Sequence, residues 1–373
     1  MTRLRFNTSI AAFAVLVMAA TTAAAQVTTG GIGGSIADES GRPLADVQVH
    51  VVNTATGFKF SGTSRANGRY LIPNLEVGSS YTIEVRRIGF APITRDSIVV
   101  TLGETTDQDF TLHAQATQLS AITVNEDPSN VFTPSRNGAE SELSANQISH
   151  LPTLGRDVTT LVKYTPQVNN QTGGGPSAGG QYNRYNNFTI DGANQNDAFG
   201  LSASGGVPGG ATNAHVISMD AVKEFQVQMA PADVRQGNFT GMAVNMVTKN
   251  GTNTWTGGAS YSYRDPSLAS NQTFIKTGDL RVSSEGFYVG GPIIKDKLHI
   301  FVAPEFQSRS NPASGTYIGA PLTDPGLVSA DSINRIINYF KSQGIDVGNG
   351  GQVSVQNPLT NLMGRLDWQV NDN

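Results

Sequence analysis

The chain contains no cysteine among its 373 residues. Disulfide bridges, thiolate nucleophiles and cysteine-ligated zinc are therefore excluded, and each domain must be stable through its own hydrophobic core. Charged residues make up only 14%, and the net charge of −4 offers no basic excess for nucleic acid. The five histidines are scattered singly, and we find no nucleophile–base pair and no HExxH motif. We therefore expect neither an enzyme, nor a cofactor, nor a metal site.

Long apolar runs are missing as well. After the N-terminus, no stretch approaches the roughly 18 apolar residues that a transmembrane helix requires. The N-terminus itself resembles a secretory signal, because Arg3 and Arg5 precede a short apolar run from Ile10 to Ala20. Small residues for cleavage follow at Ala23 to Ala25. We expect residues 1–25 to be removed, so that the mature chain begins outside the cytoplasm.

Glycine is abundant, with 41 residues, and this composition is typical of a turn-rich β protein. Between residues 26 and 113, short alternating runs, such as Val47 to Val51 and Tyr81 to Val85, are separated by turn signals about every ten residues. Asn67-Gly68 is a signal for a tight hairpin. The pattern predicts a small antiparallel sandwich of about seven strands.

Residues 114–134 have the composition of a linker, polar and with two prolines. One isolated β-prone run lies within it, formed by Ala121, Ile122, Thr123, Val124 and Asn125. No neighbouring strand signal offers it a partner. Such a segment either serves as a template for strand addition by another chain, or joins a sheet of its own chain. The sequence alone leaves both possibilities open.

Residues 135–250 have a mixed α/β pattern. Ser144 is placed to cap a short helix, and a second, amphipathic helix is expected from Leu154 to Val162. Asp191-Gly192 predicts a turn after a strand. Another short helix is expected at 218–222, leading into the strand 224–229.

Residues 251–373 return to alternation. Trp255, Tyr261 and Tyr263 share one parity, while hydroxyl side chains fill the other; a second such run places Trp368 on its apolar parity. Two settings produce this pattern. In a soluble sandwich the apolar parity faces the core, and in an outer-membrane barrel it faces lipid while the polar parity faces the lumen. A long polar insertion, 310–357, favours the barrel, whose outer loops are long.

A resemblance to known families supports the barrel. The N-terminal segments GGSIADESGRPLADVQVHVVNTATG and ANGRYLIPNLEVGSSYTIEVRRIGF resemble the carboxypeptidase regulatory-like domain, a non-catalytic transthyretin-like sandwich. The later segments NNFTIDGANQND, VKEFQVQMAPADVRQGNFTGMAVNMVTKNGTNTWTGGASYSYRD and GFYVGGPIIKDKLHIFVAPEFQ resemble the plug and first barrel strands of TonB-dependent receptors of the Oar-like group. The match covers nearly all of the mature chain in family order.

The resemblance implies a mainly β architecture. Its expected parts are a signal peptide (1–25), a β-sandwich (26–113), a linker (114–134), an α/β plug (135–250) and the start of an outer-membrane barrel (251–373). A barrel of 22 strands needs roughly 200 residues for its strands alone, so residues 251–373 are expected to supply only its first strands. We therefore expect a larger intact receptor, located in the outer membrane of a Gram-negative-type bacterium with its N-terminal domains in the periplasm.

The resemblance also assigns roles to particular residues. The isolated run from Ala121 to Asn125 occupies the place of the TonB box, which adds as a strand to TonB. The plug motif residues, expected to be structural, are Asp191, Gly192, Glu224 and Gly241. The residues expected to face lipid are Trp255, Tyr261, Tyr263 and Trp368.

The expected function is active uptake of an unidentified extracellular ligand, with TonB and outer-membrane lipid as partners. The alternative is a soluble secreted or periplasmic carbohydrate-binding protein that uses the N-terminal sandwich. In that case, the aromatic residues available to stack on a sugar are Phe58, Phe60, Tyr70, Tyr81 and Phe90.

Overall fold

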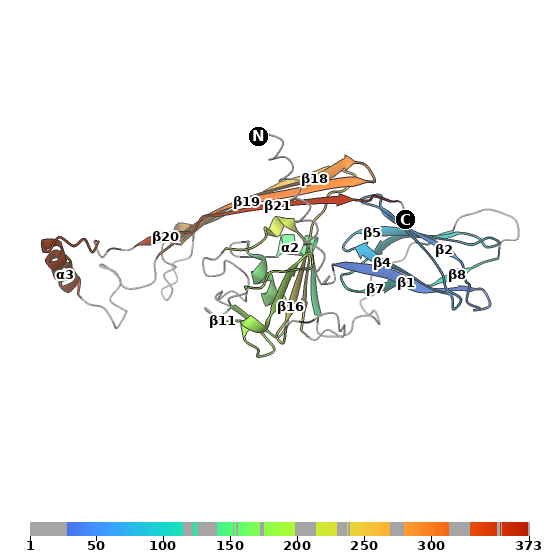
Figure 1. The fold of residues 1–373 in the computed structure, drawn as a ribbon, viewed down its shortest axis with the longest axis horizontal. Helices are drawn as coiled ribbons and strands as arrows, with labels where there is room; N and C mark the ends of the chain where they lie inside the picture. Colours follow the sequence, from blue (N-terminus) through green and yellow to red (C-terminus); the bar gives the residue numbers. More distant parts are fainter. Residues whose placement is uncertain are drawn as a thin grey trace, which may run out of the picture.

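The computed structural model describes residues 28–114, 122–124, 140–151, 153, 156–171, 175–197, 214–229, 237, 239–268, 280–312, 329–348, 351 and 353–371. The expected signal peptide lies outside these residues. Three β-rich bodies are arranged along the chain, and Figure 1 shows them as a sandwich in blue, a middle domain in green and a layer of long strands in orange and red. The mainly β fold class predicted from the sequence is confirmed.

The N-terminal domain is a sandwich of two sheets around a core that includes Ile36, Val49, Tyr81 and Phe110. One sheet has the order β4-β1-β7 with β8 also on β1, and the other has the order β3-β2-β5-β6-β9. The strands are β1 (Thr29–Asp38), β2 (Gln48–Asn53), β3 (Lys59–Thr63), β4 (Arg69–Glu76), β5 (Ser80–Arg86), β6 (Ile93–Val99), β7 (Thr105–Asp107), β8 (Phe110–Leu112) and β9 (Ile122–Val124).

The hairpin predicted at Asn67-Gly68 is wrong. Gly68 does turn the chain, with a φ of 75°, and its N–H donates to the carbonyl of Arg65. However, β3 before the turn pairs with β2, while β4 after it pairs with β1 in the opposite sheet. The turn therefore carries the chain from one layer of the sandwich to the other, which a local turn signal does not distinguish from a hairpin.

The middle domain contains a five-stranded sheet with the order β10-β15-β16-β13-β14. β13 and β16 run parallel, and the other pairs are antiparallel. Ser144 caps the first helix, as predicted, and also forms a capping box with Gln147. The elements are β10 (Glu140–Ser144), α2 (Ala145–His150), η2 (Val158–Tyr164), β11 (Val168–Gln171), β12 (Gly175–Ala178), η3 (Asn183–Tyr185), β13 (Asn187–Ile190), β14 (Ala193–Asn194), η5 (Met219–Ala221), β15 (Val222–Gln228) and β16 (Ala243–Thr248).

The amphipathic helix expected from Leu154 to Val162 differs in form from the prediction. A 3-10 helix, η2, occupies Val158–Tyr164 instead, and Leu154 lies outside the described residues. Its apolar residues are nevertheless buried in the core of the middle domain, among them Val158, Leu161 and Val162. The spacing thus identified the apolar face correctly but not the helix type.

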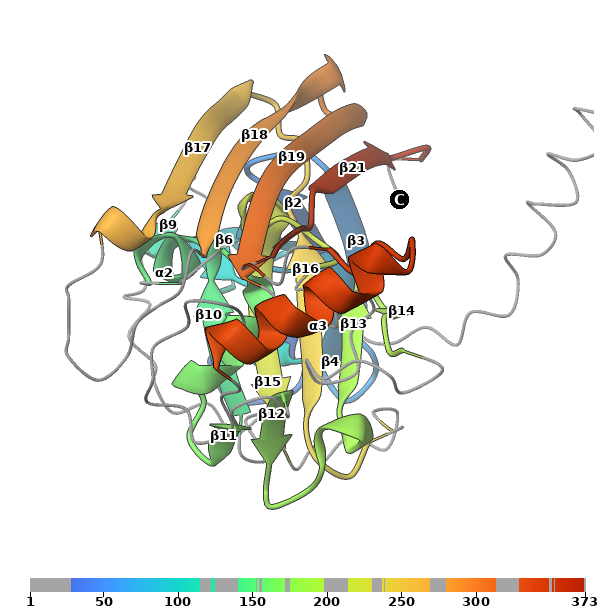
Figure 2. The same ribbon diagram turned by 90° about the vertical axis from the view of Figure 1, so that its left-hand side faces the viewer.

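The third body is an antiparallel layer with the order β17-β18-β19-β21, in which β20 also pairs with the far end of β19. Figure 2 shows this layer curving over the middle domain, and Figure 1 shows α3 beyond one end of the layer. Among the described residues, none of the helices has the length and apolar character needed to cross a bilayer. The elements are β17 (Thr256–Arg264), η6 (Pro266–Leu268), β18 (Arg281–Ile294), β19 (Leu298–Pro312), α3 (Ala330–Ser342), β20 (Ser354–Gln356) and β21 (Leu359–Trp368).

Glycines in the long strands make room for aromatic rings on neighbouring strands. A Cβ at Gly291 would lie 2.2 Å from the Trp255 indole, and one at Gly258 would lie 2.7 Å from the Tyr288 ring. These distances are below any real Cβ contact, so the missing side chains are what allow the rings to lie flat across the sheet.

We expect Gly291→Val to displace the Trp255 indole and to change its fluorescence. The measurement uses a Trp368→Phe background, which leaves Trp255 as the single tryptophan because the chain has two. Gly257→Val serves as the control, since a Cβ there meets no ring. An emission maximum that moves equally in both variants would show that Gly291 has no special role in seating the indole.

Candidate functional site: the interface between the middle domain and the long strands

The long strands present their large apolar side chains to the outside. Trp255 is 61% exposed, Tyr261 67% and Trp368 65%, and Tyr263 is exposed as well. The alternation seen in the sequence is therefore real in three dimensions, and the apolar parity does not face a core of the chain itself. The further exposed apolar residues of this face are Phe287, Val289, Phe306, Leu362 and Leu366.

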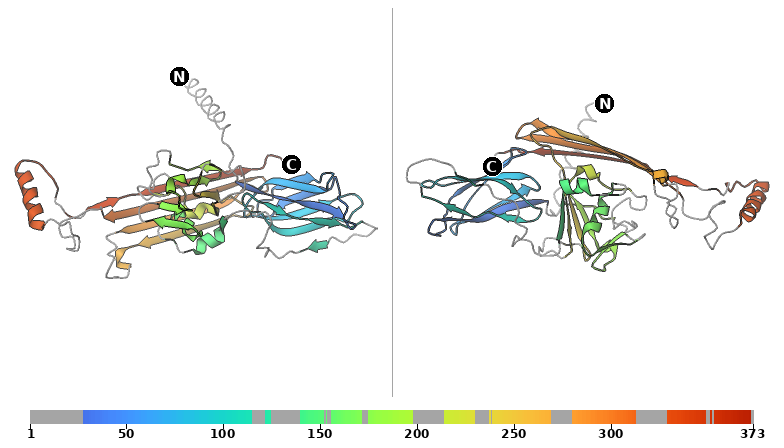
Figure 3. Two further views of the ribbon diagram at one scale, coloured as in Figure 1. Left: turned by 90° about the horizontal axis from the view of Figure 1, so that it is seen from below. Right: turned by 180° about the vertical axis from the view of Figure 1, so that it is seen from behind.

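The opposite parity faces the middle domain and is largely polar. On β17, Ser260, Ser262 and Arg264 are less exposed than the aromatic residues between them. Phe301 and Ala303 of β19 are exceptions, because they pack into the core cluster of the middle domain. Their apolar character had blurred the alternation of this strand in the sequence. The sheet thus has one apolar outer face and one inner face that binds a folded domain (Figure 3).

The centre of this interface is a buried pair of ionisable side chains. Nε2 of His215, in the middle domain, lies 2.7 Å from Oε2 of Glu305 on β19, and both side chains are 1% exposed. The hydroxyl of Ser284 donates to the other carboxylate oxygen at 3.0 Å, and the Asn361 amide donates to the carbonyl of His215 at 3.1 Å. Burial lowers the pKa of His215, but the hydrogen bond and the negative charge of Glu305 outweigh it and raise that pKa overall.

A second polar contact lies beside η5. The Asp220 carboxylate accepts a hydrogen bond from Ser260 of β17 at 2.5 Å and forms an ion pair with Arg156. Gly286 of β18 leaves the space that Asp220 occupies, since a Cβ there would lie 2.5 Å from its carboxylate oxygen. Neither His215, Glu305 nor Asp220 belongs to a motif, and the sequence analysis did not find them. The one available signal was an acidic residue, Glu305, on the inward parity of a strand.

Asp191, which the resemblance assigns to the plug motif, lies at the turn between β13 and β14. Its carboxylate accepts hydrogen bonds from the N–H of Thr248 at 2.9 Å and from its hydroxyl at 2.6 Å. Arg365 of β21 donates in turn to the carbonyl of Thr248 at 3.0 Å. Asp191 and Gly192 have φ values of 46° and 76°, so the turn uses the left-handed conformation that these residue types tolerate. Thr248, the last residue of β16, therefore connects this turn to β21 of the long strands.

Gly241 lies two residues before β16, and its lack of a side chain matters. A Cβ at this position would lie 2.4 Å from Oδ1 of Asn186. That oxygen accepts a hydrogen bond from the N–H of Met242, and the Asn186 amide donates to the carbonyl of Pro176 at 2.8 Å. The glycine therefore lets one buried asparagine connect three segments of the middle domain.

Glu224 faces the sandwich rather than the long strands. It is 2% exposed, and its carboxylate accepts a hydrogen bond from the N–H of Leu102 at 3.2 Å. Gln226 donates to the carbonyl of the same leucine at 3.1 Å. Burial, together with the nearby carboxylate of Glu142, raises the pKa of Glu224 to about 8. Leu102 itself packs with Val77 and Val247.

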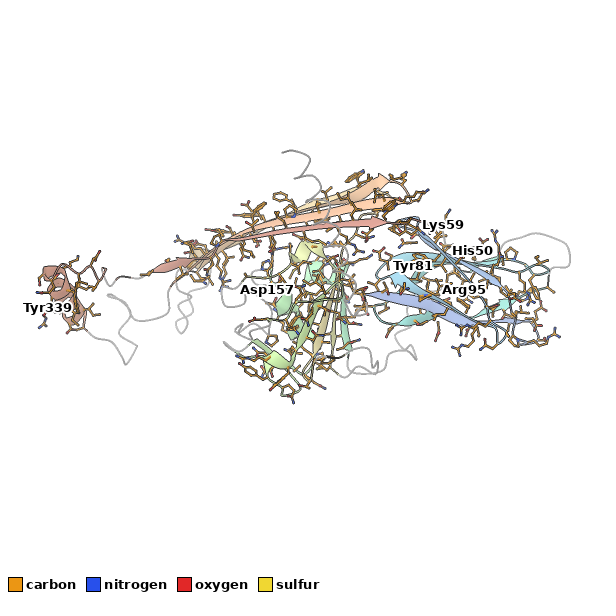
Figure 4. The ribbon with its side chains drawn as sticks, viewed as in Figure 1. His50, Lys59, Tyr81, Arg95, Asp157 and Tyr339 are labelled. Carbon is orange, nitrogen blue, oxygen red and sulfur yellow. The ribbon has the colours of Figure 1, made fainter. Side chains whose placement is uncertain are left out.

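The sandwich contacts the long strands as well as the middle domain. The Gln369 side chain exchanges two hydrogen bonds with the backbone of Lys59, at 2.8 and 3.2 Å. The N–H of Asn253 donates to the carbonyl of Ala55 at 2.8 Å, and the Lys223 ammonium lies 2.7 Å from the Glu76 carboxylate. Figure 4 places Lys59 where the sandwich meets the end of the strand layer. The sandwich is thus bound both to the long strands and to the middle domain.

The isolated linker run is only partly described. Ile122 to Val124 form β9 on the sandwich, while Ala121 and Asn125 lie outside the described residues.

In the part of the chain that the structure describes, no group of three or more His, Asp and Glu side chains is placed to hold a metal ion.

Comparison with known proteins agrees with this arrangement. Residues 31–113 match the family model of the carboxypeptidase regulatory-like domain, and residues 247–358 match that of an outer membrane beta barrel domain. The TonB-dependent transporter Oar of Myxococcus xanthus is 27% identical over 297 residues, which is 74% of this chain and 26% of that protein. The chain is similar to a TonB-dependent transporter. The resemblance stated from the sequence is confirmed, and these matches support an outer-membrane location.

Two solved structures also share similarity. The siderophore receptor PirA of Acinetobacter baumannii is 20% identical, with a TM-score of 0.41, over 63% of this chain and 30% of that one. The outer membrane transporter YddB of Escherichia coli is 13% identical, with a TM-score of 0.43, over 63% of this chain and 31% of that one. The chain thus spans less than a third of the length of each of these relatives.

Proposed function

We propose that this chain works as part of a TonB-dependent outer-membrane transporter that takes up an extracellular ligand. One observation carries the proposal: a strand layer with an apolar exposed outer face holds a folded domain on its polar inner face. A barrel wall with its lumen occupied by a plug requires this division of the two faces. In this assignment the middle domain is the plug, and Trp255, Tyr261, Tyr263 and Trp368 face lipid.

The lengths of the connections support one orientation of the strands in the membrane. The turn between β18 and β19 is short, at residues 295–297, and it lies at the end of the strands where the sandwich binds. The connections at the opposite end are long, and one of them carries α3 (Figure 1). In bacterial outer-membrane barrels, short turns face the periplasm and long loops face the exterior. The sandwich is therefore assigned to the periplasm.

The mechanism follows from the contacts of the plug. The plug is held against the long strands by polar contacts at His215, Asp220 and Asp191, beside the apolar contact of Phe301 and Ala303 with its core. Hydrogen-bonded contacts of this kind can be exchanged for water when the plug rearranges. A strand supplied by residues 121–125 would pair with TonB in the periplasm, and force applied through it would move the plug. Import of this kind involves no bond making or breaking in the ligand.

The alternative function, soluble carbohydrate binding by the sandwich, is not favoured by any feature of its aromatic residues. Tyr70 and Tyr81 are buried in the sandwich core, at 4% and 0% exposure. Phe60 and Phe90 pack against that core, and Phe58 lies edge-on to His299 of β19. No exposed aromatic platform for a sugar ring is therefore formed by these five residues.

The lipid-facing assignment is tested by charge substitution at different depths. Leu362 lies in the middle of β21 and is 77% exposed, whereas Val370 lies beyond the end of that strand and is also exposed. An arginine on the lipid face costs about 2–4 kcal/mol at the bilayer midplane and about 0–1 kcal/mol near the interfaces. We expect Leu362→Arg to reduce outer-membrane assembly severalfold and Val370→Arg to leave it nearly unchanged, as measured by membrane fractionation. Equal assembly of both variants would contradict a membrane-embedded wall.

A further inference from the structure

The linker strand β9 does not stand alone in the structure. Ile122, Thr123 and Val124 pair in parallel with Ile93, Thr94 and Arg95 of β6. β6 pairs with β5 on its other side, so β9 occupies the outer edge of this sheet. Figure 2 shows β9 beside β6. Of the two possibilities that the sequence left open for this run, pairing within its own chain is the one adopted.

The path of the chain explains why this edge is within reach. The sandwich ends at Ala114, which forms a bridge with Phe90, and the carbonyl of His113 accepts the N–H of Ala91. Ala114 therefore lies beside Phe90, which is three residues before the start of β6. The chain leaves the sandwich at this point and returns to it at Ile122. Only residues 115–121 lie between these points, so returning to β6 closes a short loop at a small entropic cost.

The pairing is also short enough to be reversible. It involves three residue pairs, and a backbone hydrogen bond contributes only about 0.5–1.5 kcal/mol to stability after exchange with water. An edge strand has unpaired N–H and C=O groups that accept any suitable strand. A second chain that offers a longer edge to residues 122–124 can therefore displace β6.

We propose that the β6 edge of the sandwich is the resting site of the linker strand, and that TonB can pair with residues 122–124 only after they have left this edge. The proposal rests on the proposed function, because it takes this strand as the segment that TonB binds. It gives the accessory sandwich a role of its own, which is to control the availability of the strand.

The absence of cysteine allows a direct test of the resting position. Thr94 and Thr123 are partners in the β6–β9 register, and neighbouring strands lie about 4.8 Å apart, within the Cα separation that a disulfide spans. In the full chain, we expect Thr94→Cys/Thr123→Cys to form a disulfide under mild oxidation. Ser61→Cys/Thr123→Cys is the matched control, because Ser61 is exposed on β3 at the other edge of the same sheet. That pair should stay reduced and react with maleimide.

The release step is tested with the purified periplasmic domain of TonB from the same host. Oxidation of the Thr94→Cys/Thr123→Cys variant should weaken its binding at least tenfold, and reduction with dithiothreitol should restore it. Equal crosslinking of the two cysteine pairs would overturn the resting position. A disulfide that forms but leaves TonB binding unchanged would overturn the requirement for release. If the wild-type chain does not bind TonB at all, the proposed function fails, while crosslinking still reports where the strand rests.

Discussion

Replacing Glu305 with alanine will destabilise the packing of the middle domain against the strands by about 3–5 kcal/mol. The variant leaves the imidazole of His215, which is 1% exposed, without its charged partner, and it removes the acceptor for Ser284. A buried charge without a partner is costly because burial has removed its hydration and nothing replaces it. Thermal unfolding of the detergent-solubilised chain should show a melting temperature lower by on the order of 10 °C.

A neighbouring glutamate provides the matched control for this experiment. Glu285 lies on β18 next to Gly286, the partner of Glu305, but its side chain points to the exposed face. We expect Glu285→Ala to change the melting temperature by no more than about 2 °C, since its side chain lies on the face of β18 that points away from the middle domain. His215→Leu/Glu305→Leu should recover most of the loss, because an apolar pair leaves no buried charge. A Glu305→Ala variant as stable as Glu285→Ala would show that the pair is not buried.

The same pair gives a pH dependence with a definite sign. The pKa of His215 is raised in the folded chain, so its protonated form is favoured by folding. The corresponding stabilisation is complete below the unfolded pKa near 6.5 and is lost as the pH rises through the higher folded value. The difference in melting temperature between the wild-type chain and His215→Leu should therefore shift in favour of the variant as the pH is raised.

Replacing Glu224 with glutamine will stabilise the chain at alkaline pH. Its folded pKa is about 8, compared with 4.5 for an ordinary glutamate, so the folded chain holds a proton that the unfolded chain releases. Stability therefore falls as the pH rises from 4.5 towards 8, by on the order of a few kcal/mol, since each pKa unit corresponds to about 1.4 kcal/mol. Glutamine keeps the neutral form and an oxygen that can accept the N–H of Leu102.

The test compares melting temperatures of the wild-type chain and Glu224→Gln at pH 5 and pH 9. We expect little difference at pH 5 and a clear gain for the variant at pH 9. Glu76→Gln is the matched control at the same domain boundary, because it removes the partner of Lys223 and should lower stability. If Glu224→Gln destabilised the chain at pH 9, its carboxylate would be charged in the folded state and not buried against the sandwich.

Strand parity was the most informative property of the sequence. A period of two reports directly which side chains share a face, so Tyr261, Tyr263 and Trp368 were placed together without knowledge of the neighbouring strands. The prediction of a hairpin at Asn67-Gly68 was wrong because a turn signal carries no information about strand pairing. Its residue types specify the local backbone, but the pairing of β3 with β2 and of β4 with β1 depends on segments far along the chain.

The contacts across the interface could not be predicted from the sequence. His215 and Glu305 are separated by 90 positions, and Asp191 reaches Arg365 only through Thr248. Neither spacing forms a local motif, and both pairs exist because the middle domain lies against the inner face of the strands. The linker strand shows the same limit, since its own residues do not specify that β6 is its partner.

The attachment of the sandwich at two places has a mechanical consequence. Gln369 and Asn253 fasten it to the ends of the long strands, while Leu102 and Glu76 join it to the middle domain. A displacement of the middle domain that leaves the strands fixed must shear the second set of contacts and spare the first. The sandwich would then stay attached to the long strands and would not move with the middle domain. Leu102, which contacts the middle domain at Glu224 and Val247, would be exposed to water for as long as the displacement lasts.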